Sequence, residues 1–302
     1  MKPLLDSIAV QQNVPFNEIG VIVCNDGGSP VDWLQPSPSG EAFFIDYQGY
    51  YPFRIDYYYE EHGGVSATRN KALDHATAEY VMFCDCDDIF ANVCGLWLIF
   101  NEIQNGFDVF VSKFMEEVRY QGAPQYITKP WDSTFIHGKA FRRQYLIDTG
   151  IRFDESLTIH EDTYFNCLAQ QLSENVVYCP TPFYLWKWRD NSVVRREEDF
   201  LHATYEHLLK ATTALTDELL RRGRKADAIF MAVNIMYEAY LKLTEWNDPE
   251  ANRLFVQYIK PYRELEYEIP NSHRELIIKR RGQKKPIEEQ MFQRWLNEIM
   301  SD

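Results

Sequence analysis

The sequence lacks the features of a membrane or secreted protein. No apolar run approaches the roughly 18 residues that a membrane-spanning helix needs, and the start, MKPLLDSIAVQQNVPFNE, has neither the apolar core nor the small-residue cleavage site of a signal peptide. Basic residues are also few, because 31 Lys and Arg stand against 45 Asp and Glu, a formal net charge of -14. This balance excludes a general binder of nucleic-acid backbones, which needs a basic surface. We expect a cytoplasmic protein with no transmembrane segment.

Metal-binding cysteine pairs are absent as well. The six cysteines include no C-x-x-C pair and most lie within apolar runs, so we interpret them as reduced core thiols and not as zinc ligands. What the sequence does contain is a globular composition, with 45% hydrophobic and 25% charged residues over 302 positions. Disorder is therefore excluded, and one large or two modest domains are expected.

Short apolar runs alternate with helical stretches from the N-terminus to about residue 190. The pattern predicts strands at residues 19–24, 53–59 and 80–84, and helices at residues 139–148 and 161–172. Such alternation is typical of an α/β layer fold with a largely parallel sheet flanked by helices.

The apolar spacing changes to three and four residues beyond residue 199. It predicts two amphipathic helices, at about residues 201–219 and 229–243, packed as a hairpin. We therefore expect a domain at 1–195 and a C-terminal helical region at 196–302. A basic segment at 273–285 can make peripheral contact with an anionic membrane, although a solvated helix face is the preferred interpretation.

The most informative motif is YVMFCDCDDIF, in which an apolar strand delivers Asp85 and Asp87 at its carboxyl end. Residues two apart on a strand point to the same side, so both carboxylates can converge on one point. Ligands bind at this edge of open α/β sheets, and oxygen ligands favour Mg²⁺ or Mn²⁺. The alternative is an acidic turn that caps the next helix.

Three further segments carry candidate site residues, each with a structural alternative. Asp26 follows the strand at 19–24 and can accept from a base or a ribose, or can simply belong to a turn. Gly63 and Gly64 open a helix whose first N–H groups can bind phosphate, with Arg69 one turn further on. The acidic pair at residues 161 and 162 starts another helix, where it can favour the helix dipole or remove a proton from a hydroxyl.

A resemblance to the glycosyltransferase family 2 pattern of GT-A-fold enzymes is carried by three segments: VIVCNDGGS, GVSATRNKALDHATAEYVMFCDCDD and HGKAFRRQYLIDTGIRFDESLTIHEDTYF. It covers about residues 1–195, with several motifs in the expected order. It implies a GT-A (Rossmann-like), mostly parallel sheet flanked by helices. The implied reaction is metal-dependent, inverting transfer from a nucleoside diphosphate sugar, by default a UDP-sugar. The Q-x-x-R-W signature of processive synthases is absent, which favours transfer of a single sugar.

The resemblance also implies roles for individual residues. Asp26 would contact the nucleotide base, and Arg69 would lie near the nucleotide. Asp85 would bind ribose or metal, and Asp87, in the position of the DxD motif, would ligate Mn²⁺ or Mg²⁺.

Catalysis is assigned by the same resemblance to Asp162, as the base that deprotonates the acceptor hydroxyl, with Glu161 beside it. The acceptor can be a glycan, a lipid-linked sugar, a protein or a modified base. One departure concerns the start of the chain. Family members usually begin with a strand and a loop, whereas LLDSIAVQQ matches the helix that follows them. We expect a truncated form or a domain that has lost a central strand.

Three other functions fit the pattern less well. Nucleotidyl transfer needs a basic, Gly-rich triphosphate loop, which the sequence does not contain. A haloacid-dehalogenase-type phosphatase needs D-x-D-x-[TV], but Ile89 follows Asp88. The remaining alternative is a catalytically degenerate GT-A domain that binds glycan, nucleotide or a protein partner without turnover.

Overall fold

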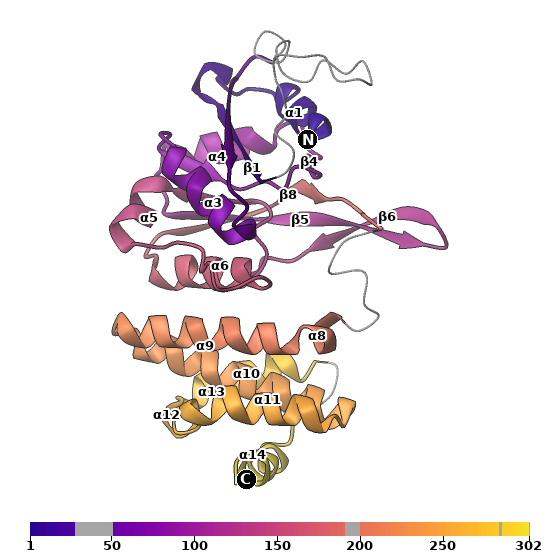
Figure 1. Cartoon of the computed structure of the whole chain (residues 1–302), viewed down its shortest axis with the longest axis vertical. Helices are drawn as coiled ribbons and strands as arrows, with labels where there is room; N and C mark the ends of the chain where they lie inside the picture. Colours follow the sequence, from indigo (N-terminus) through magenta and orange to yellow (C-terminus); the bar gives the residue numbers. More distant parts are fainter. Residues whose placement is uncertain (28–50, 191–199, 284–285, 302) are drawn as a thin grey trace. The chain divides into compact units, whose positions relative to one another are not determined.

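The computed structural model describes residues 1–27, 51–190, 200–283 and 286–301 of the chain. The chain divides into two compact units, Met1–Ser192 and Val193–Asp302. The first unit combines strands and helices, and the second is built from helices (Figure 1). A separate cluster of buried apolar side chains lies in each unit.

The described strands of the first unit form two separate sheets. The smaller sheet pairs β1 (Gly20–Asp26) with β2 (Arg54–Glu60) in parallel. The larger sheet has the order β3-β7-β5-β8-β4, and β6 pairs with β5 at the side of this path. Its strands are β3 (Tyr80–Met82), β4 (Ile89–Phe90), β5 (Val109–Tyr120), β6 (Ala123–Lys129), β7 (Lys139–Arg142) and β8 (Val176–Trp186).

The larger sheet is mixed, where we expected mostly parallel pairings. Strands β5 and β8 are parallel, whereas the β3–β7, β4–β8, β5–β6 and β5–β7 pairs are antiparallel. A tight turn explains one of these pairs, because Gln121 and Gly122 between β5 and β6 both have positive φ angles, 51° and 80°. Such a two-residue turn joins only antiparallel strands. The expected α/β class, with a sheet flanked by helices and a helical C-terminal extension, is confirmed.

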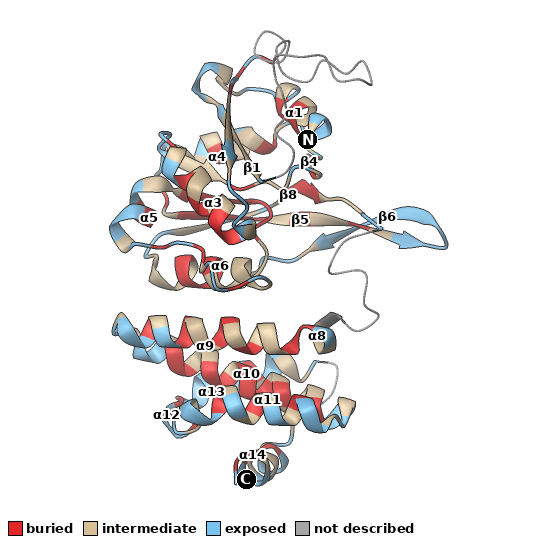
Figure 2. Ribbon diagram, in the orientation of Figure 1, coloured by how far each residue is buried: buried red, intermediate tan, exposed pale blue. Residues whose placement is uncertain are grey.

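Helices cover the strands of the first unit. They are α1 (Lys2–Ala9), α3 (Gly64–His75), α4 (Gly95–Ile103), α5 (Arg143–Thr149) and α6 (Glu161–Leu172), with a short 3₁₀ helix, η1 (Phe16–Glu18). Helix α1 shows why they pack there: Leu4, Leu5 and Ile8 lie on one face and are buried with Phe53 and Phe90 (Figure 2). An apolar stripe at this spacing is stable only when it faces a core.

The prediction of a helix over residues 139–148 is wrong for its first half. Residues Lys139–Arg142 form β7, and the helix α5 begins only at Arg143. Ala140 lies opposite Met82 of β3 and opposite Phe110 of β5. Local helix preference is weak, and pairing with strands on both sides overrides it. The predicted helix at 161–172 is confirmed.

The second unit consists of α8 (Phe200–Ala203), α9 (Tyr205–Arg221), α10 (Lys225–Trp246), α11 (Pro249–Ile259), η2 (Lys260–Tyr262), α12 (Leu265–Glu268), α13 (Asn271–Arg281) and α14 (Glu289–Met300). The predicted helical hairpin is α9 and α10, which meet at Gly223 with a φ angle of 73°. Asp248 caps α11 by accepting a hydrogen bond from the Glu250 N–H at 2.9 Å, next to Pro249 at the first helical position. No helix among the described residues is long and apolar enough to cross a membrane.

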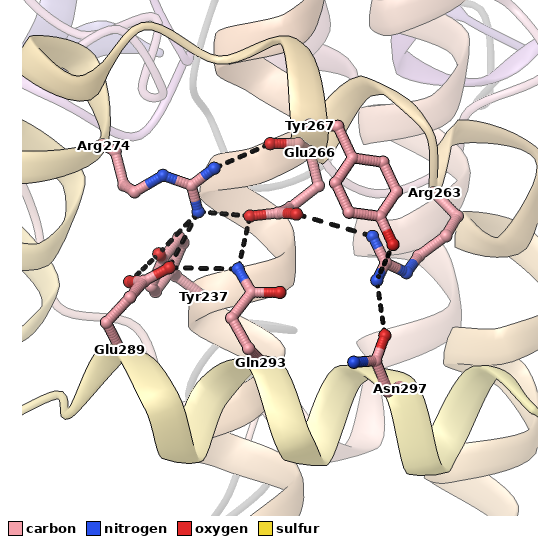
Figure 3. A network of polar contacts seen from close by, with 8 residues as sticks. All are labelled: Tyr237, Arg263, Glu266, Tyr267, Arg274, Glu289, Gln293 and Asn297. Carbon is pink, nitrogen blue, oxygen red and sulfur yellow. Dashed lines mark hydrogen bonds and ion pairs between the residues drawn. The ribbon is translucent and has the colours of Figure 1, made fainter.

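A buried carboxylate organises the later helices of this unit. Glu266 is 1% exposed and forms an ion pair with Arg274 (Figure 3). Gln293 donates to the same carboxylate at 2.6 Å, and Arg263 Nη1 lies 3.5 Å from its other oxygen. Arg274 also pairs with Glu289 at 2.9 Å. The Glu266 carboxylate of α12 therefore connects this helix to α13 and α14 through Arg274 and Gln293.

Candidate active site

Asp26, at the end of β1, accepts hydrogen bonds from the start of helix α3. The backbone N–H groups of Gly63 and Gly64 donate to its two carboxylate oxygens at 2.8 and 3.2 Å. Burial alone would raise the pKa of Asp26, but these bonds, a hydrogen bond from Thr68 and the nearby His62 together lower it. Asp26 is therefore ionised and bound to a helix N-terminus.

The contacts of the Gly63-Gly64 loop differ from the phosphate contacts that we expected for it. The N–H groups that we expected to face a phosphate donate to a carboxylate of the chain itself. Gly27, beside Asp26, has a φ angle of 71°, and a Cβ atom there would lie 2.6 Å from the Cβ of His62. The turn after β1 thus requires glycine. Gly28 and Ser29 lie outside the described residues.

Arg69 connects two of the predicted acidic segments. Its Nη2 atom donates to Asp85 and its Nη1 atom to Glu161, both at 2.9 Å. The side chain is 14% exposed, and its guanidinium group lies 5.4 Å from the centre of the Phe153 ring. Burial disfavours its charge, but Asp85, Glu161 and Asp162 outweigh that effect and raise the pKa of Arg69. The structure therefore brings Arg69, Asp85 and the start of α6 together around one buried cation.

Asp162 lies beside this cation without an ion pair of its own among the described contacts. One of its oxygens accepts from the Thr163 N–H at 2.7 Å. Burial is the main cause that raises the pKa of Asp162 to about 7; the neighbouring Glu161 carboxylate raises it further, while Arg69 and Lys139 act in the opposite direction. His160, just before the pair, has a left-handed φ angle of 65°, an uncommon conformation that sets the entry into α6. Asp162 can thus gain or lose a proton near neutral pH.

The three aspartates after β3 have different surroundings. Asp85 faces Arg69, whereas Asp87 forms an ion pair with Arg189. Asp88 is fully buried; it accepts from the Tyr184 hydroxyl at 2.8 Å and from the Lys187 N–H at 2.9 Å. Burial, aided by the charges of its two aspartate neighbours, raises the pKa of Asp88 to about 7.

A histidine that the sequence reasoning missed lies beside these aspartates. Side-chain atoms of Asp85, Asp88 and His137 lie within 4.8 Å of one another. His137 is 5% exposed, its Nδ1 atom has no hydrogen-bond partner, and burial lowers its pKa to about 4. A neutral imidazole with an unpartnered nitrogen next to two carboxylates is a donor set that suits a divalent cation. A single histidine inside an apolar segment gives no such signal in the sequence.

Residues 1–156 match the model of glycosyl transferase family 2. The chain belongs to this family. The resemblance found in the motifs is thereby confirmed, and the chain is a glycosyltransferase.

Its relatives within curated proteins are distant. The chain is 24% identical to EpsH of Bacillus subtilis, a protein named as a glycosyltransferase, over 81% of this chain and 74% of EpsH. It is 24% identical to GgaB of the same species, a minor teichoic acid biosynthesis protein, over 78% of this chain but only 27% of GgaB. Family 2 membership thus rests on the match of the family model to residues 1–156 and not on close identity to these relatives.

Solved structures agree on the fold. TarS of S. aureus in complex with UDP-GlcNAc is 19% identical, with a TM-score of 0.63 over 92% of this chain and 80% of that chain. The TarS complex with UDP has a TM-score of 0.61 at 19% identity, over 91% of this chain and 81% of that chain. At this identity the similarity establishes a shared architecture. The roles of individual residues depend on the geometry described above.

Proposed function

We propose that the chain transfers a single sugar, with inversion, from a nucleoside diphosphate sugar to an acceptor hydroxyl. The observation that carries this proposal is the group formed by Arg69, Asp85, Glu161 and Asp162, which joins the ends of three separate segments at one place. A UDP-sugar is the proposed donor, supported by the fold shared with TarS, which was solved with UDP and with UDP-GlcNAc. The candidate acceptors are a glycan, a lipid-linked sugar, a protein and a modified base.

Asp162 is the proposed catalytic base. Its neighbour Glu161 is engaged by Arg69, which leaves Asp162 as the carboxylate free of a direct cationic partner in the described contacts. With a pKa of about 7 it is both substantially ionised at neutral pH and basic enough to take the acceptor proton. Arg69 holds Glu161 in place and keeps positive charge beside the reacting groups.

The donor side of the site is proposed to include Asp26, Arg69 and Asp85. Asp26 is held ionised by α3 and can accept from a hydroxyl or imide N–H of the nucleoside. A Mn²⁺ or Mg²⁺ ion would be held by Asp85 with Asp87, once Asp87 leaves Arg189, or by Asp85 with Asp88 and His137. When bound, such an ion neutralises negative charge on the departing diphosphate.

A second candidate is a degenerate domain that binds nucleotide or glycan without turnover. One observation favours it: β1 and β3, which carry Asp26 and Asp85 at their ends, belong to different sheets. A donor site divided between two sheets is less firmly positioned than one on a single sheet.

The two candidates are separated by measuring binding and turnover on the same preparation. Nucleoside diphosphate sugars are screened by thermal shift with and without Mn²⁺, because a ligand that binds only the folded state raises the unfolding midpoint. Turnover of each binding donor is then measured as release of the nucleoside diphosphate. A metal-dependent shift with turnover supports the transferase, and a shift without turnover supports a degenerate nucleotide binder. The absence of any shift contradicts both of these and leaves only a degenerate domain that binds glycan.

A further inference from the structure

Lys139, the first residue of β7, is a lysine that has no contact with solvent. Its side chain is 0% exposed, and it lies opposite Val111 of the inner strand β5. Lysine is almost never fully buried in proteins unless it is paired. Neither the sequence motifs nor the reaction proposed above assigns a role to this residue, so its charge requires an explanation.

The ammonium group of Lys139 holds a turn that precedes β7. Its Nζ atom donates to the Phe135 carbonyl oxygen and lies 3.5 Å from Asp132 Oδ1. The same Asp132 oxygen accepts from the backbone N–H groups of Thr134 and Phe135, at 2.7 and 2.8 Å. A side-chain oxygen that bonds the backbone which follows it fixes a turn. Lys139 therefore binds the turn at residues 132–135 at both of its ends.

The 132–135 turn also supports helix α6. Three consecutive carbonyl oxygens of the turn, those of residues 132, 133 and 134, accept hydrogen bonds from side chains of α6: Gln170 at 3.4 Å, Cys167 at 3.2 Å and Asn166 at 2.8 Å. The next carbonyl, that of Phe135, is the one that Lys139 binds. Removal of this donor would leave a polar group of the turn without its partner, which destabilises a folded chain. Lys139 thus connects β7 to α6 through a single turn.

The charge of Lys139 acts on the first turn of α6. The charged groups around Asp162 come from three elements: Glu161 of α6 itself, Arg69 of α3 and Lys139 of β7. Burial raises the pKa of Asp162 and so does Glu161, whereas Arg69 and Lys139 lower it. Arg69 already forms two ion pairs at 2.9 Å, so Lys139 is a second source of positive charge for this carboxylate.

The surroundings of Lys139 show the same relation from the other side. Burial lowers the pKa of Lys139, and Asp132, Asp162 and the Cys167 thiol act in the opposite direction. Asp132 and Asp162 therefore share the charge of one buried lysine. A buried carboxylate without a cation nearby keeps its proton to higher pH and is a poor base at neutral pH.

We propose that Lys139 is a positioning residue for Asp162: it fixes helix α6 through the 132–135 turn and supplies a buried positive charge to the surroundings of the Asp162 carboxylate. The inference rests on the proposed function, in which Asp162 takes the proton of the acceptor hydroxyl. Lys139 acts through Asp162 and not on the substrate.

The test compares variants of the full chain that differ in charge at position 139. Lys139→Met and Lys139→Gln remove the charge, and Gln keeps an N–H donor for the Phe135 carbonyl. Lys139→Arg keeps the charge. The matched control is Lys129→Met, which removes a lysine of β6 that pairs with Glu116 at 2.9 Å.

Two measurements are made on each variant. The titration of Asp162 is followed by NMR with ¹³C-labelled aspartate, and its signal is identified as the one missing from Asp162→Asn. The pH dependence of turnover is measured as release of the nucleoside diphosphate. The first measurement needs neither donor nor acceptor.

We expect Lys139→Met and Lys139→Gln to raise the titration midpoint of Asp162 by about one pH unit, because a nearby opposite charge lowers the pKa of a carboxylate by about 1–3 units. Turnover should fall about fivefold at pH 7 and recover about two pH units higher, since the ionised form of the base is the active one. Lys139→Arg and Lys129→Met should keep the original midpoint. A loss of packing alone would not move the pH profile in this direction.

Asp132→Asn provides a second variant in case the loss of Lys139 unfolds the unit. Asn keeps a side-chain oxygen that accepts from the Thr134 and Phe135 N–H groups, but the negative charge beside Lys139 is removed. Asp162 is then the remaining carboxylate of the pair that shares this lysine. Its titration midpoint should therefore move to lower pH, opposite to the shift in Lys139→Gln.

An unchanged Asp162 midpoint in Lys139→Gln, an equal shift in Lys129→Met, or a rise in Asp132→Asn overturns the inference. Shifts of opposite sign in Lys139→Gln and Asp132→Asn support it. If the Asp162 midpoint shifts as expected and the turnover profile does not follow, the result supports the effect of Lys139 and contradicts Asp162 as the base. The failure of this inference and the failure of the proposed function are thereby distinguished.

Discussion

Glu161 and Asp162 are adjacent in the sequence, yet their carboxyl groups lie in different electrostatic surroundings. Arg69 binds Glu161 directly at 2.9 Å, whereas Asp162 meets the backbone N–H of Thr163. The ion pair therefore occupies the Glu161 carboxylate, whereas the described contacts of Asp162 include no cation. The proposed assignment of the catalytic base to Asp162 rests on this difference in contacts.

The first prediction concerns the pH dependence of turnover. Asp162 accepts a proton only when it is ionised, so turnover should rise as the pH increases through about 7, the pKa of this group. Replacement of Asp162 by Asn should lower turnover by roughly a hundredfold or more and remove this rise. Donor affinity, measured by calorimetry, should change little, because the donor contacts assigned above involve other residues.

The matched control for this prediction is Glu161→Gln. Full turnover in Asp162→Asn together with loss in Glu161→Gln would identify the right motif and the wrong base.

The raised pKa of Asp162 also has a consequence for the pH dependence of stability. Because the folded-state pKa of Asp162 lies above the ordinary 3.8, its protonated form stabilises the fold at low pH, and this contribution is lost as the pH rises to 7. The Asn variant should lack that loss.

A second prediction concerns the metal ion. We expect Asp87→Asn to abolish the Mn²⁺ dependence of nucleotide binding while the far-UV circular dichroism spectrum stays unchanged, because Asp87 is only partly buried and its ion-pair partner Arg189 is exposed. His137→Gln is measured in parallel. Retention of the metal dependence in Asp87→Asn with loss in His137→Gln would place the ion between Asp85, Asp88 and His137.

The sequence motifs include residues that the structure brings into contact, but they say little about the environment of those residues. Asp85, Arg69 and Glu161 belong to motifs with a recognisable order, and the structure joins them. His137 lies in no such pattern, because its proximity to Asp88 arises only when β7 is placed beside β3. The pKa of Asp162 depends on burial, and burial is a property of the folded chain.

At the scale of elements, the turn into β7 depends on a glycine. Gly138 has a φ angle of 67°, and a Cβ atom there would lie 2.5 Å from the Ser112 Oγ atom. Gly138→Ala should therefore destabilise the fold by about 2–4 kcal/mol, from the left-handed backbone and the steric overlap together. Urea unfolding measures the change.

Gly106 provides the control for this change. It also has a positive φ angle, 71°, but a Cβ atom there would meet nothing within 4 Å. Gly106→Ala should cost only about 1 kcal/mol, from the backbone alone. Equal losses for the two variants would show that the contact with Ser112 is irrelevant.

Element boundaries could be predicted where the residues that determine them lie within one segment of the chain. Helix α6 begins and ends where the sequence predicts, because its acidic start and apolar spacing lie within one segment. The strand β7 was not found, since Ala140 becomes a strand residue through its partners Met82 and Phe110, which are distant in the chain. The β5–β6 hairpin was missed as well, although its Gln-Gly turn is a recognisable signal.

At the scale of the whole molecule, we propose that residues 1–195 and 196–302 are separate folding units. The helical unit has its own core, which includes Leu209, Met236, Phe255 and Phe292. Its buried carboxylate, Glu266, belongs to this unit together with all the partners described for it. Each unit should therefore resist proteolysis by itself.

The last prediction tests this organisation with the full chain. Limited proteolysis should leave two resistant fragments that meet near residue 195, because both units contain a buried core. Glu266→Ala should remove the protection of the C-terminal fragment alone: it removes the buried counter-charge of Arg263 and leaves Arg274 with Glu289 only, a loss of about 3 kcal/mol. The control is Glu250→Ala, which removes an exposed pair with Arg253 and should cost less than about 1 kcal/mol. Rapid loss of everything beyond residue 199 from the unmodified chain would contradict a separately folded helical unit, and equal effects of the two substitutions would show that the Glu266 network does not stabilise it.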